Sequence, residues 1–215
     1  MKALFVTAIG TEIGKTYVSA KLLEHWRAEG ETVAAVKPVM SGFGEHELGQ
    51  SDAGQLLAGC GLPVSPEAVS GVCLHRFEAP LAPNVAMRQA GVAQDYPAIL
   101  DFTRNAMERS SAQRMIVEGA GGVMSPLTDD KLQIDFMADL DLPILLVAAP
   151  YLGAVSHTLT ALDALSGRGL SVDRLIVSQP DATSDPEALA HEVALFRDVP
   201  TSIVPHGGKI AINFD

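Results

Sequence analysis

The feature that most constrains the fold of this chain is a lysine, Lys15, that follows a predicted buried strand after a short turn. Residues 3–7 form an aliphatic and β-branched run, a turn with Gly10 follows, and Gly14-Lys15-Thr16 opens an amphipathic helix. Glycine lets backbone N–H groups approach an anion, the helix N-terminus adds partial positive charge, Lys15 adds a full charge, and a threonine hydroxyl can hold Mg²⁺. This order of elements predicts a phosphate-binding loop for a nucleotide.

The loop does not match the usual motif at every position. Ile9 stands where the first glycine is usual, and Ala8 stands where a longer version of the motif would start. A Gly-Lys-Thr sequence alone is common, but one that follows a strand and opens a helix is much more specific. We therefore favour nucleotide binding over an incidental turn.

Size and charge limit the possible partners. The chain has 215 residues, of which 47 % are apolar and 19 % charged, and this predicts one soluble domain over residues 1–215. Its 15 basic and 26 acidic residues give a net charge of −11, which disfavours nucleic acid and acidic membrane surfaces as partners. An anionic substrate would need local cations, and Lys15 and Lys37 are the candidates.

The cysteines and the N-terminal sequence favour a cytoplasmic location. Cys60 and Cys73 are too few for a disulfide framework or a zinc site, and we expect both to be reduced. The first strand begins within two residues of the N-terminus, which leaves no room for a targeting peptide. No apolar run reaches the roughly 18 residues that a membrane helix needs.

Strand-like and helix-like segments alternate along the chain, and the strand-like ones are almost continuously apolar. We predict a three-layer, doubly wound α/β fold of the P-loop NTPase type, with a mostly parallel sheet and helices on both faces. Pro38 is expected to end regular structure after the second strand, residues 69–74 are a further candidate strand, and residues 75–91 are expected to form a long ordered loop with a short helix. The predicted strands are 3–7, 32–36, 115–117, 143–149, 174–178 and 202–204, and the predicted helices are 15–29, one from residue 52, 96–109, 132–140, 153–168 and 186–196.

Polar residues gather just past the predicted strand ends. Ligands of such sheets bind outside the carboxyl ends of the strands, so we expect these residues to share one site. The segments concerned are 11–16, 37–41, 118–122, 150–156 and 178–181.

Three charged residues have both an ordinary and a functional interpretation. Lys37 is either a solvated surface residue or a ligand contact, and Pro38 favours the second because it stiffens the chain where ligands bind. Glu118 either caps the glycine turn 119–122 or lies near Mg²⁺, which prefers hard oxygen ligands. Asp52 opens a helix, where acidic residues are common for dipole reasons alone. The six histidines show no metal-ligand spacing.

Several motifs together resemble the dethiobiotin synthetase family, in order and over most of the chain. They are Gly14-Lys15-Thr16, Lys37-Pro-Val-Met-Ser41-Gly42, Ser51-Asp52-Ala53, Ala79-Pro80 with Pro83, Val117-Glu-Gly-Ala-Gly-Gly122, and Leu152-Gly153 with Ser156-His157. The resemblance implies an ATP- and Mg²⁺-dependent ligase of the penultimate step of biotin biosynthesis. In that reaction CO₂ is captured as a carbamate on 7,8-diaminononanoate, ATP phosphorylates the carbamate, and the second amine closes the ureido ring of dethiobiotin.

The roles of individual residues are likewise implied by the resemblance. Lys37 and Lys15 would be catalytic, with Lys37 stabilising the carbamate. The metal ligands would be Thr16, Asp52 and Glu118. The substrate would be bound by Thr11, Lys37, Ser41, Gly153 and Ser156. The nucleotide would contact Glu12, Ile13, Gly14, Lys15, Thr16, Tyr17, Asp52, Glu118, Gly119, Ala120, Gly121, Pro205 and His206.

The resemblance also implies a homodimer with shared active sites, in which the helix that begins near Gly153 binds the substrate carboxylate of the partner subunit. Family members often have Asn where Ser156 stands. They usually have Gly where Ala8 stands and commonly Asp where Gly10 stands. Ser178-Gln179 replaces a base-reading Asn-Asp pair, which leaves the preferred nucleotide open.

Three other functions are compatible with a phosphate loop. A partition or positioning ATPase switch would carry a signature lysine at position 10, where this chain has Gly10, and the chain has no basic patch or amphipathic C-terminal helix for a DNA or membrane contact. A related amidating synthetase would need a glutaminase segment with a reactive cysteine, and none follows. A non-catalytic relative is the third alternative, motivated by Ala8 and Ser178-Gln179.

Overall fold

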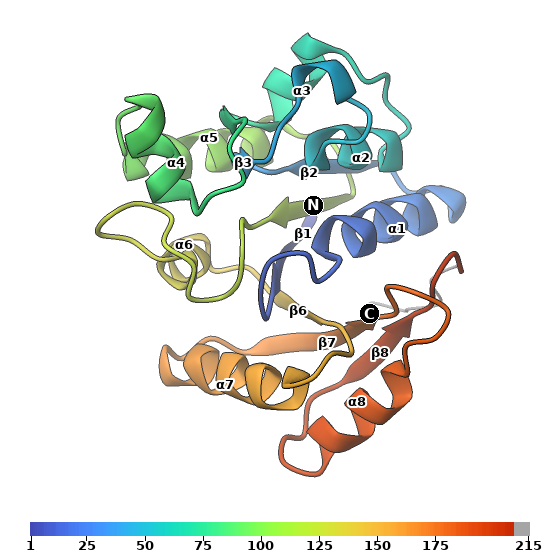
Figure 1. Cartoon of the computed structure of the whole chain (residues 1–215). Helices are drawn as coiled ribbons and strands as arrows, with labels where there is room; N and C mark the ends of the chain where they lie inside the picture. Colours follow the sequence, from blue (N-terminus) through green and yellow to red (C-terminus); the bar gives the residue numbers. More distant parts are fainter. Residues whose placement is uncertain (209–215) are drawn as a thin grey trace.

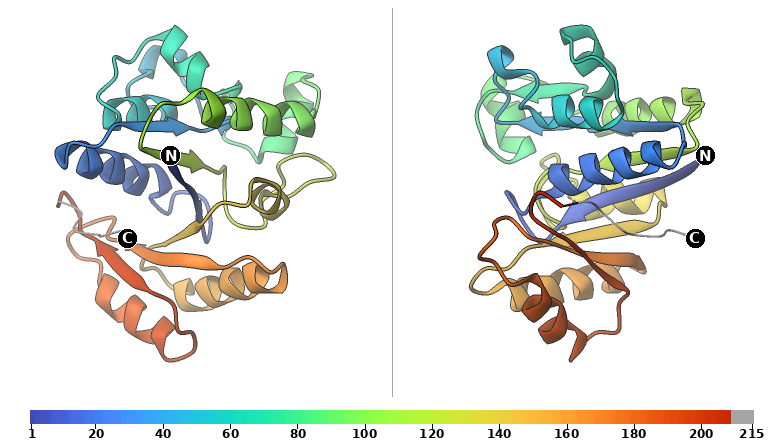
Figure 2. Two further views of the ribbon diagram at one scale, coloured as in Figure 1. Left: turned by 180° about the vertical axis from the view of Figure 1, so that it is seen from behind. Right: turned by 90° about the vertical axis from the view of Figure 1, so that its right-hand side faces the viewer.

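The computed structural model describes residues 1–208, without the side chain of residue 45. Six strands form a parallel sheet in the order β2-β5-β1-β6-β7-β8, with helices on both faces (Figure 1, Figure 2). The predicted fold class is confirmed. The strands are β1 (Lys2–Ala8), β2 (Val33–Val36), β5 (Arg114–Glu118), β6 (Ile144–Ala148), β7 (Val172–Ser178) and β8 (Thr201–Val204).

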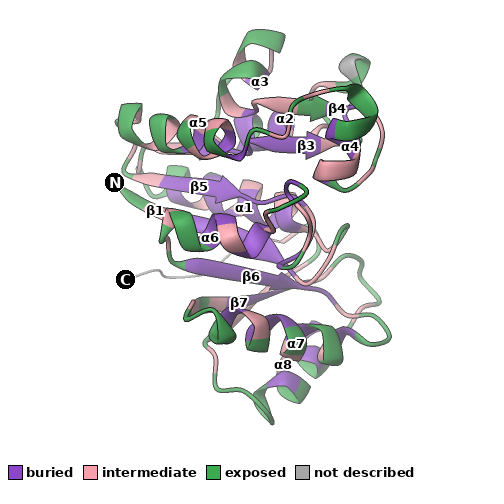
Figure 3. Ribbon diagram, turned by 90° about the vertical axis from the view of Figure 1, so that its left-hand side faces the viewer, coloured by how far each residue is buried: buried purple, intermediate pink, exposed green. Residues whose placement is uncertain are grey.

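Strand β1 lies inside the sheet and positions the loop that follows it. It pairs with β5, where Phe5 lies opposite Val117, and with β6, where Phe5 lies opposite Ile144. Residues 4–8 are buried because neighbouring strands and both helix layers cover them (Figure 3). The carboxyl end of β1 is therefore held from both sides.

Two apolar cores join the sheet to its helices. On one face, Val18, Leu22 and Trp26 of α1 recur at helical spacing and pack against the strands together with Leu56 of α2. This face carries α1 (Lys15–Ala28) and α2 (Asp52–Gly59). The core on the other face contains residues of α5 (Tyr96–Arg109), α6 (Gln133–Leu140), α7 (Ala154–Gly167) and α8 (Pro186–Ala194).

No helix within residues 1–208 is both long and apolar enough to cross a membrane.

The segment between β2 and α5 differs from the prediction. Residues 69–74, predicted as a strand, lie mostly in α3 (Pro66–Val72). Ser65 accepts the N–H of Ala68 and Pro66 occupies the first turn, and these two helix-start signals outweigh the β propensity of the valines. Residues 75–91 contain the expected short helix, α4 (Pro83–Ala90), and also an unpredicted strand, β4 (His75–Phe77).

Strand β2 ends at Val36, as predicted from Pro38, but sequence reasoning missed the return to regular structure directly after Pro38. A short strand, β3 (Val39–Ser41), follows it and pairs in parallel with β4 to form a separate two-stranded sheet. A third apolar cluster with Met40, Leu57 and Val69 packs this small sheet onto α2 and α3. The packing fixes Lys37 and Asp52 beside the carboxyl end of the main sheet. A short 3-10 helix, Glu45–Glu47, lies between β3 and α2.

Candidate active site

The phosphate loop joins β1 to α1 and depends on one glycine conformation. Gly14 has a φ of 93°, in the left-handed region. A Cβ atom there would lie 2.8 Å from Ser178 Oγ, so a larger residue would meet both backbone strain and overlap. Glycine at this position lets α1 begin directly at Lys15, with its first N–H groups available to an anion.

A cavity of about 660 Å³ opens at this end of the sheet. It brings together most of the residues predicted for nucleotide and substrate binding, although they come from segments far apart in the chain. The predicted residues that line it are Thr11, Glu12, Gly14, Lys15, Thr16, Tyr17, Lys37, Ser41, Asp52, Ala120 and Gly121.

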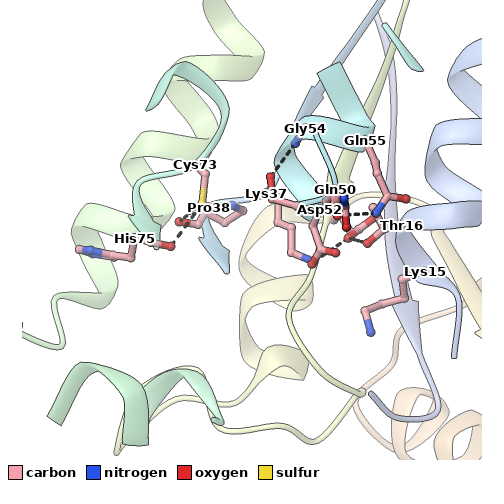
Figure 4. A network of polar contacts seen from close by, with 12 residues as sticks. Lys15, Thr16, Lys37, Pro38, Gln50, Asp52, Gly54, Gln55, Cys73 and His75 are labelled. Atoms are coloured by element: carbon pink, nitrogen blue, oxygen red, sulfur yellow. Dashed lines mark hydrogen bonds and ion pairs between the residues drawn. The ribbon is translucent and has the colours of Figure 1, made fainter. Parts of the chain in front are cut away.

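Lys37 forms the centre of a charged cluster beside this cavity. Its Nζ lies 2.6 Å from Asp52 Oδ2 and 2.6 Å from Glu118 Oε1. The Thr16 hydroxyl donates to the same Glu118 oxygen at 2.7 Å. Figure 4 shows the side chains of Lys37, Asp52 and Thr16 converging, with Lys15 close by. The side chains of Lys37 and Glu118 are 4 % and 0 % exposed, so this is an interior cluster and not a surface ion pair.

The two carboxylates keep Lys37 charged. Burial alone would lower the pKa of Lys37, but the charges of Glu118 and Asp52 outweigh it and raise the pKa above its ordinary value. Burial alone would likewise raise the pKa of Asp52, and the nearby ammonium of Lys37 outweighs it and lowers that pKa. The surface-lysine interpretation of Lys37 is therefore wrong, because the ammonium is buried and doubly paired.

Lys15 has a different environment. Its side chain donates to the backbone carbonyl of Gly10 at 3.2 Å, and the residue is 7 % exposed. Burial and then repulsion from Lys37 lower the pKa of Lys15 to about 8. A bound phosphate would supply the negative charge that this ammonium lacks, so the loop is electrostatically suited to an anion.

The oxygen atoms of the cluster suit a hard divalent cation. Glu118 Oε2 is buried and has no hydrogen-bond partner among residues 1–208, an arrangement that is costly unless a cation or donor compensates it. Together with Asp52 and Thr16 it offers the ligand type that Mg²⁺ prefers. The predicted metal ligands therefore fit the ion. This cluster has two carboxylates, and no group of three or more His, Cys, Asp or Glu side chains that could hold a metal ion occurs within residues 1–208.

The glycine turn after β5 forms one wall of the cavity. Gly119 donates its N–H to the carbonyl of Val6 at 3.0 Å, which ties the turn to β1. Ser125 Oγ accepts the N–H of Gly122 at 2.7 Å and lines the cavity. Sequence reasoning missed Ser125, whose contact depends on the shape of this turn. Other lining residues that it missed are Gln55, Leu81 and Ala82.

A second group of predicted residues meets at the start of α1. The hydroxyl of Tyr17 donates to the carbonyl of Pro205 at 3.0 Å and accepts the N–H of Gly207 at 3.1 Å. The N–H of His206 donates to the side-chain oxygen of Gln179 at 3.1 Å. The 205–207 loop is therefore held by hydrogen bonds to Tyr17 of α1 and to Gln179.

Seven predicted residues do not line the cavity: Ile13, Glu118, Gly119, Gly153, Ser156, Pro205 and His206. Glu118 reaches the site through its contact with Lys37. Gly153 and Ser156 lie at the start of α7, where Ser156 is exposed. Their role was expected across a homodimer interface, and that role stays a prediction.

Comparison with solved structures supports the fold alone, because sequence identity is low. MinD in the MinC:MinD cell division complex of Aquifex aeolicus superimposes with a TM-score of 0.57 and 12 % identity, over 95 % of this chain and 81 % of the other. The signal recognition particle receptor FtsY of Elizabethkingia anophelis gives a TM-score of 0.52 and 17 % identity, over 94 % of this chain and 58 % of the other.

Sequence comparison is more specific. Residues 2–205 match a family model described as an AAA domain. The ATP-dependent dethiobiotin synthetase BioD of Phenylobacterium zucineum is 42 % identical, with 98 % of this chain and 92 % of the relative aligned. The protein of the same name from Caulobacter vibrioides is 45 % identical, over 83 % of this chain and 80 % of the relative. The chain belongs to the ATP-dependent dethiobiotin synthetase family.

Proposed function

We propose that this protein closes the ureido ring of dethiobiotin from 7,8-diaminononanoate, CO₂ and ATP, and that a single domain performs the reaction. The observation that carries the proposal is the buried Lys37, held by Asp52 and Glu118 beside the phosphate-loop Lys15. The family relationship adds the substrate class. A positioning ATPase switch has the same fold but provides no reason for a second buried lysine facing the cavity.

The phosphate loop and the carboxylate cluster would bind the nucleotide. Lys15 and the first N–H groups of α1 would hold the β- and γ-phosphates. Thr16, Asp52 and Glu118 would hold Mg²⁺, whose charge neutralises phosphate oxygens when it is bound. The orphaned Glu118 oxygen supports this assignment. Tyr17, Pro205 and His206 would lie beside the nucleoside.

Lys37 would act on the reacting group. Its ammonium would stabilise the carbamate anion and the charge that develops as the γ-phosphoryl group is transferred. Thr11 and Ser41 line the same cavity and would orient the diamine by hydrogen bonds. Because the substrate supplies both amines, the reaction requires positioning and charge neutralisation and no protein nucleophile.

We also propose that the protein acts as a homodimer. Tyr151 and Leu152 precede α7 and are 42 % and 102 % exposed, and a second subunit would cover this apolar loop. Gly153 and Ser156 would then present the N-terminus of α7 to the substrate carboxylate in the partner's site. Sedimentation measurements that give only monomers at working concentration would refute the shared site.

The decisive experiment measures ADP release with diaminononanoate, bicarbonate and MgATP, each omitted in turn, and identifies dethiobiotin by mass spectrometry. We expect ADP release to require both the diamine and bicarbonate. ADP release that does not depend on the diamine would instead indicate an ATPase switch. Nucleotide binding without turnover under any condition would indicate a non-catalytic relative.

A further inference from the structure

We propose that Lys37 has a second role: before the metal ion binds, its ammonium group is the counter-ion that holds the carboxylates of Asp52 and Glu118 in place, and the metal ion then displaces it. Metal binding would thereby release the ammonium toward the cavity, where the substrate lies. This inference rests on the metal assignment of the proposed function. It assigns Lys37 a positioning role that precedes its contact with the carbamate.

The contacts of Lys37 carry the first step. A single ammonium nitrogen lies 2.6 Å from one oxygen of Asp52 and 2.6 Å from one oxygen of Glu118. These are two of the three side chains that would ligate Mg²⁺. A metal ion that binds both carboxylates competes with the ammonium for them, because two cations in contact with the same oxygens repel each other strongly in a site of low dielectric constant.

Burial explains why the carboxylates need this counter-ion. Glu118 is completely buried, and its charge without a partner would be strongly destabilising. Lys37 and the Thr16 hydroxyl both bind Glu118 Oε1, while Oε2 has no hydrogen-bond partner among the described residues. The ammonium therefore assembles the ligand set but leaves one oxygen uncoordinated, which gives the metal a point of entry.

The path of the released ammonium is also defined. Lys37 lines the same cavity as Lys15, Thr11 and Ser41, so a change of side-chain rotamer is enough to move its Nζ toward a ligand there. Repulsion between Lys37 and Lys15, which lowers the pKa of Lys15, opposes this movement, and a bound polyphosphate would weaken the repulsion. Binding of the metal–nucleotide complex would therefore make the Lys37 ammonium available to the carbamate.

The test measures Mn²⁺ binding in the absence of nucleotide and substrate, by electron paramagnetic resonance of free Mn²⁺. The variants are Lys37→Met and, as a matched loss of one positive charge, Lys21→Met, whose Nζ pairs with Glu24 on the surface of α1. We expect Lys37→Met to bind Mn²⁺ about tenfold tighter or more, because its competitor is gone. Lys21→Met should stay within about twofold of the wild type, since exposed charges are screened.

Equal or weaker Mn²⁺ binding by Lys37→Met would overturn the proposal. If that variant does not fold, reductive methylation of the wild type replaces it, with Lys21 as internal reference. Adding Mg²⁺ should raise the labelling of Lys37 relative to Lys21, and unchanged labelling at a Mg²⁺ concentration that displaces bound Mn²⁺ would refute the release. If neither protein binds Mn²⁺, the metal assignment and this inference both fail, while the ADP-release assay judges the reaction separately.

Discussion

The conformation of Gly14 allows a quantitative test of the phosphate loop. In Gly14→Ala the new methyl group meets two separate obstacles. A φ of 93° lies in the left-handed region, which costs an L-residue about 1–2 kcal/mol. The Cβ atom would also lie 2.8 Å from Ser178 Oγ, and relieving such an overlap in a packed interior costs about 1–3 kcal/mol. We expect Gly14→Ala to lower the free energy of unfolding by about 2–5 kcal/mol in total.

The two contributions separate in a double-mutant cycle with Ser178→Ala. Removing the Ser178 hydroxyl leaves its Cβ atom 3.4 Å from the position of the new methyl group, which is an ordinary contact. The double variant should therefore regain about 1–3 kcal/mol relative to the additive expectation and keep only the backbone penalty. Guanidinium unfolding of the four proteins measures these values, with MgATP binding by calorimetry as a second readout. Additive effects would refute the overlap, and a fully tolerated Gly14→Ala would refute the backbone argument as well.

Three further changes probe the site. Lys37→Ala should keep MgATP affinity at least close to that of the wild type while lowering turnover about 10²–10³-fold, the scale of a lost preorganised charge; unchanged turnover would exclude a role in chemistry. Burial lowers the pKa of Lys15 from 10.5 to about 8. Between these pH values the unfolded chain binds a proton that the folded protein has released, so the free energy of unfolding of the wild type, relative to that of Lys15→Met, should rise with pH. A difference in denaturation midpoints that does not change with pH would contradict this. Tyr17→Phe removes both hydrogen bonds to the 205–207 loop. At about 1 kcal/mol or less per bond, this should weaken nucleotide binding roughly tenfold. An unchanged affinity measured by calorimetry would show that the loop does not contact the nucleotide.

Local sequence signals predicted most of the main sheet and its helices. Long periodic segments such as 96–109 match α5 (Tyr96–Arg109), because apolar spacing and capping residues are contained within the segment itself. Ser51 precedes the predicted helix start at Asp52, and its hydroxyl accepts the N–H of Gly54 as a helix cap. Such elements need no information from distant parts of the chain.

The segment around β3 and β4 could not be predicted in this way. Both strands have three residues, and a short parallel pair exists only because each strand finds the other across some thirty intervening residues. Pro38 marked the end of β2 correctly but did not indicate β3, which starts just after the proline and needs no N–H from it. Tertiary context decided this region.

The candidate site was likewise predictable only in part. Proximity of Lys37 and Glu118 was expected because parallel strands end at one edge, and that of Asp52 was implied only by the family resemblance. Their charge pairing depends on distances that a sequence does not contain. Whether Lys37 was solvated or buried was open until the contacts with both carboxylates were known. Ser125 was missed because its role depends on the shape of the turn that it closes.

The place of β1 between β5 and β6 has a consequence for biosynthesis. The strand that precedes the phosphate loop is translated before either of its neighbours, and both neighbours leave the ribosome only after more than half of this sequence has been made. The link from Tyr17 to the 205–207 loop forms later still. A nascent chain that stalls before β8 would therefore carry the Gly-Lys-Thr sequence without a completed pocket, and nucleotide would be captured only as synthesis of this region finishes.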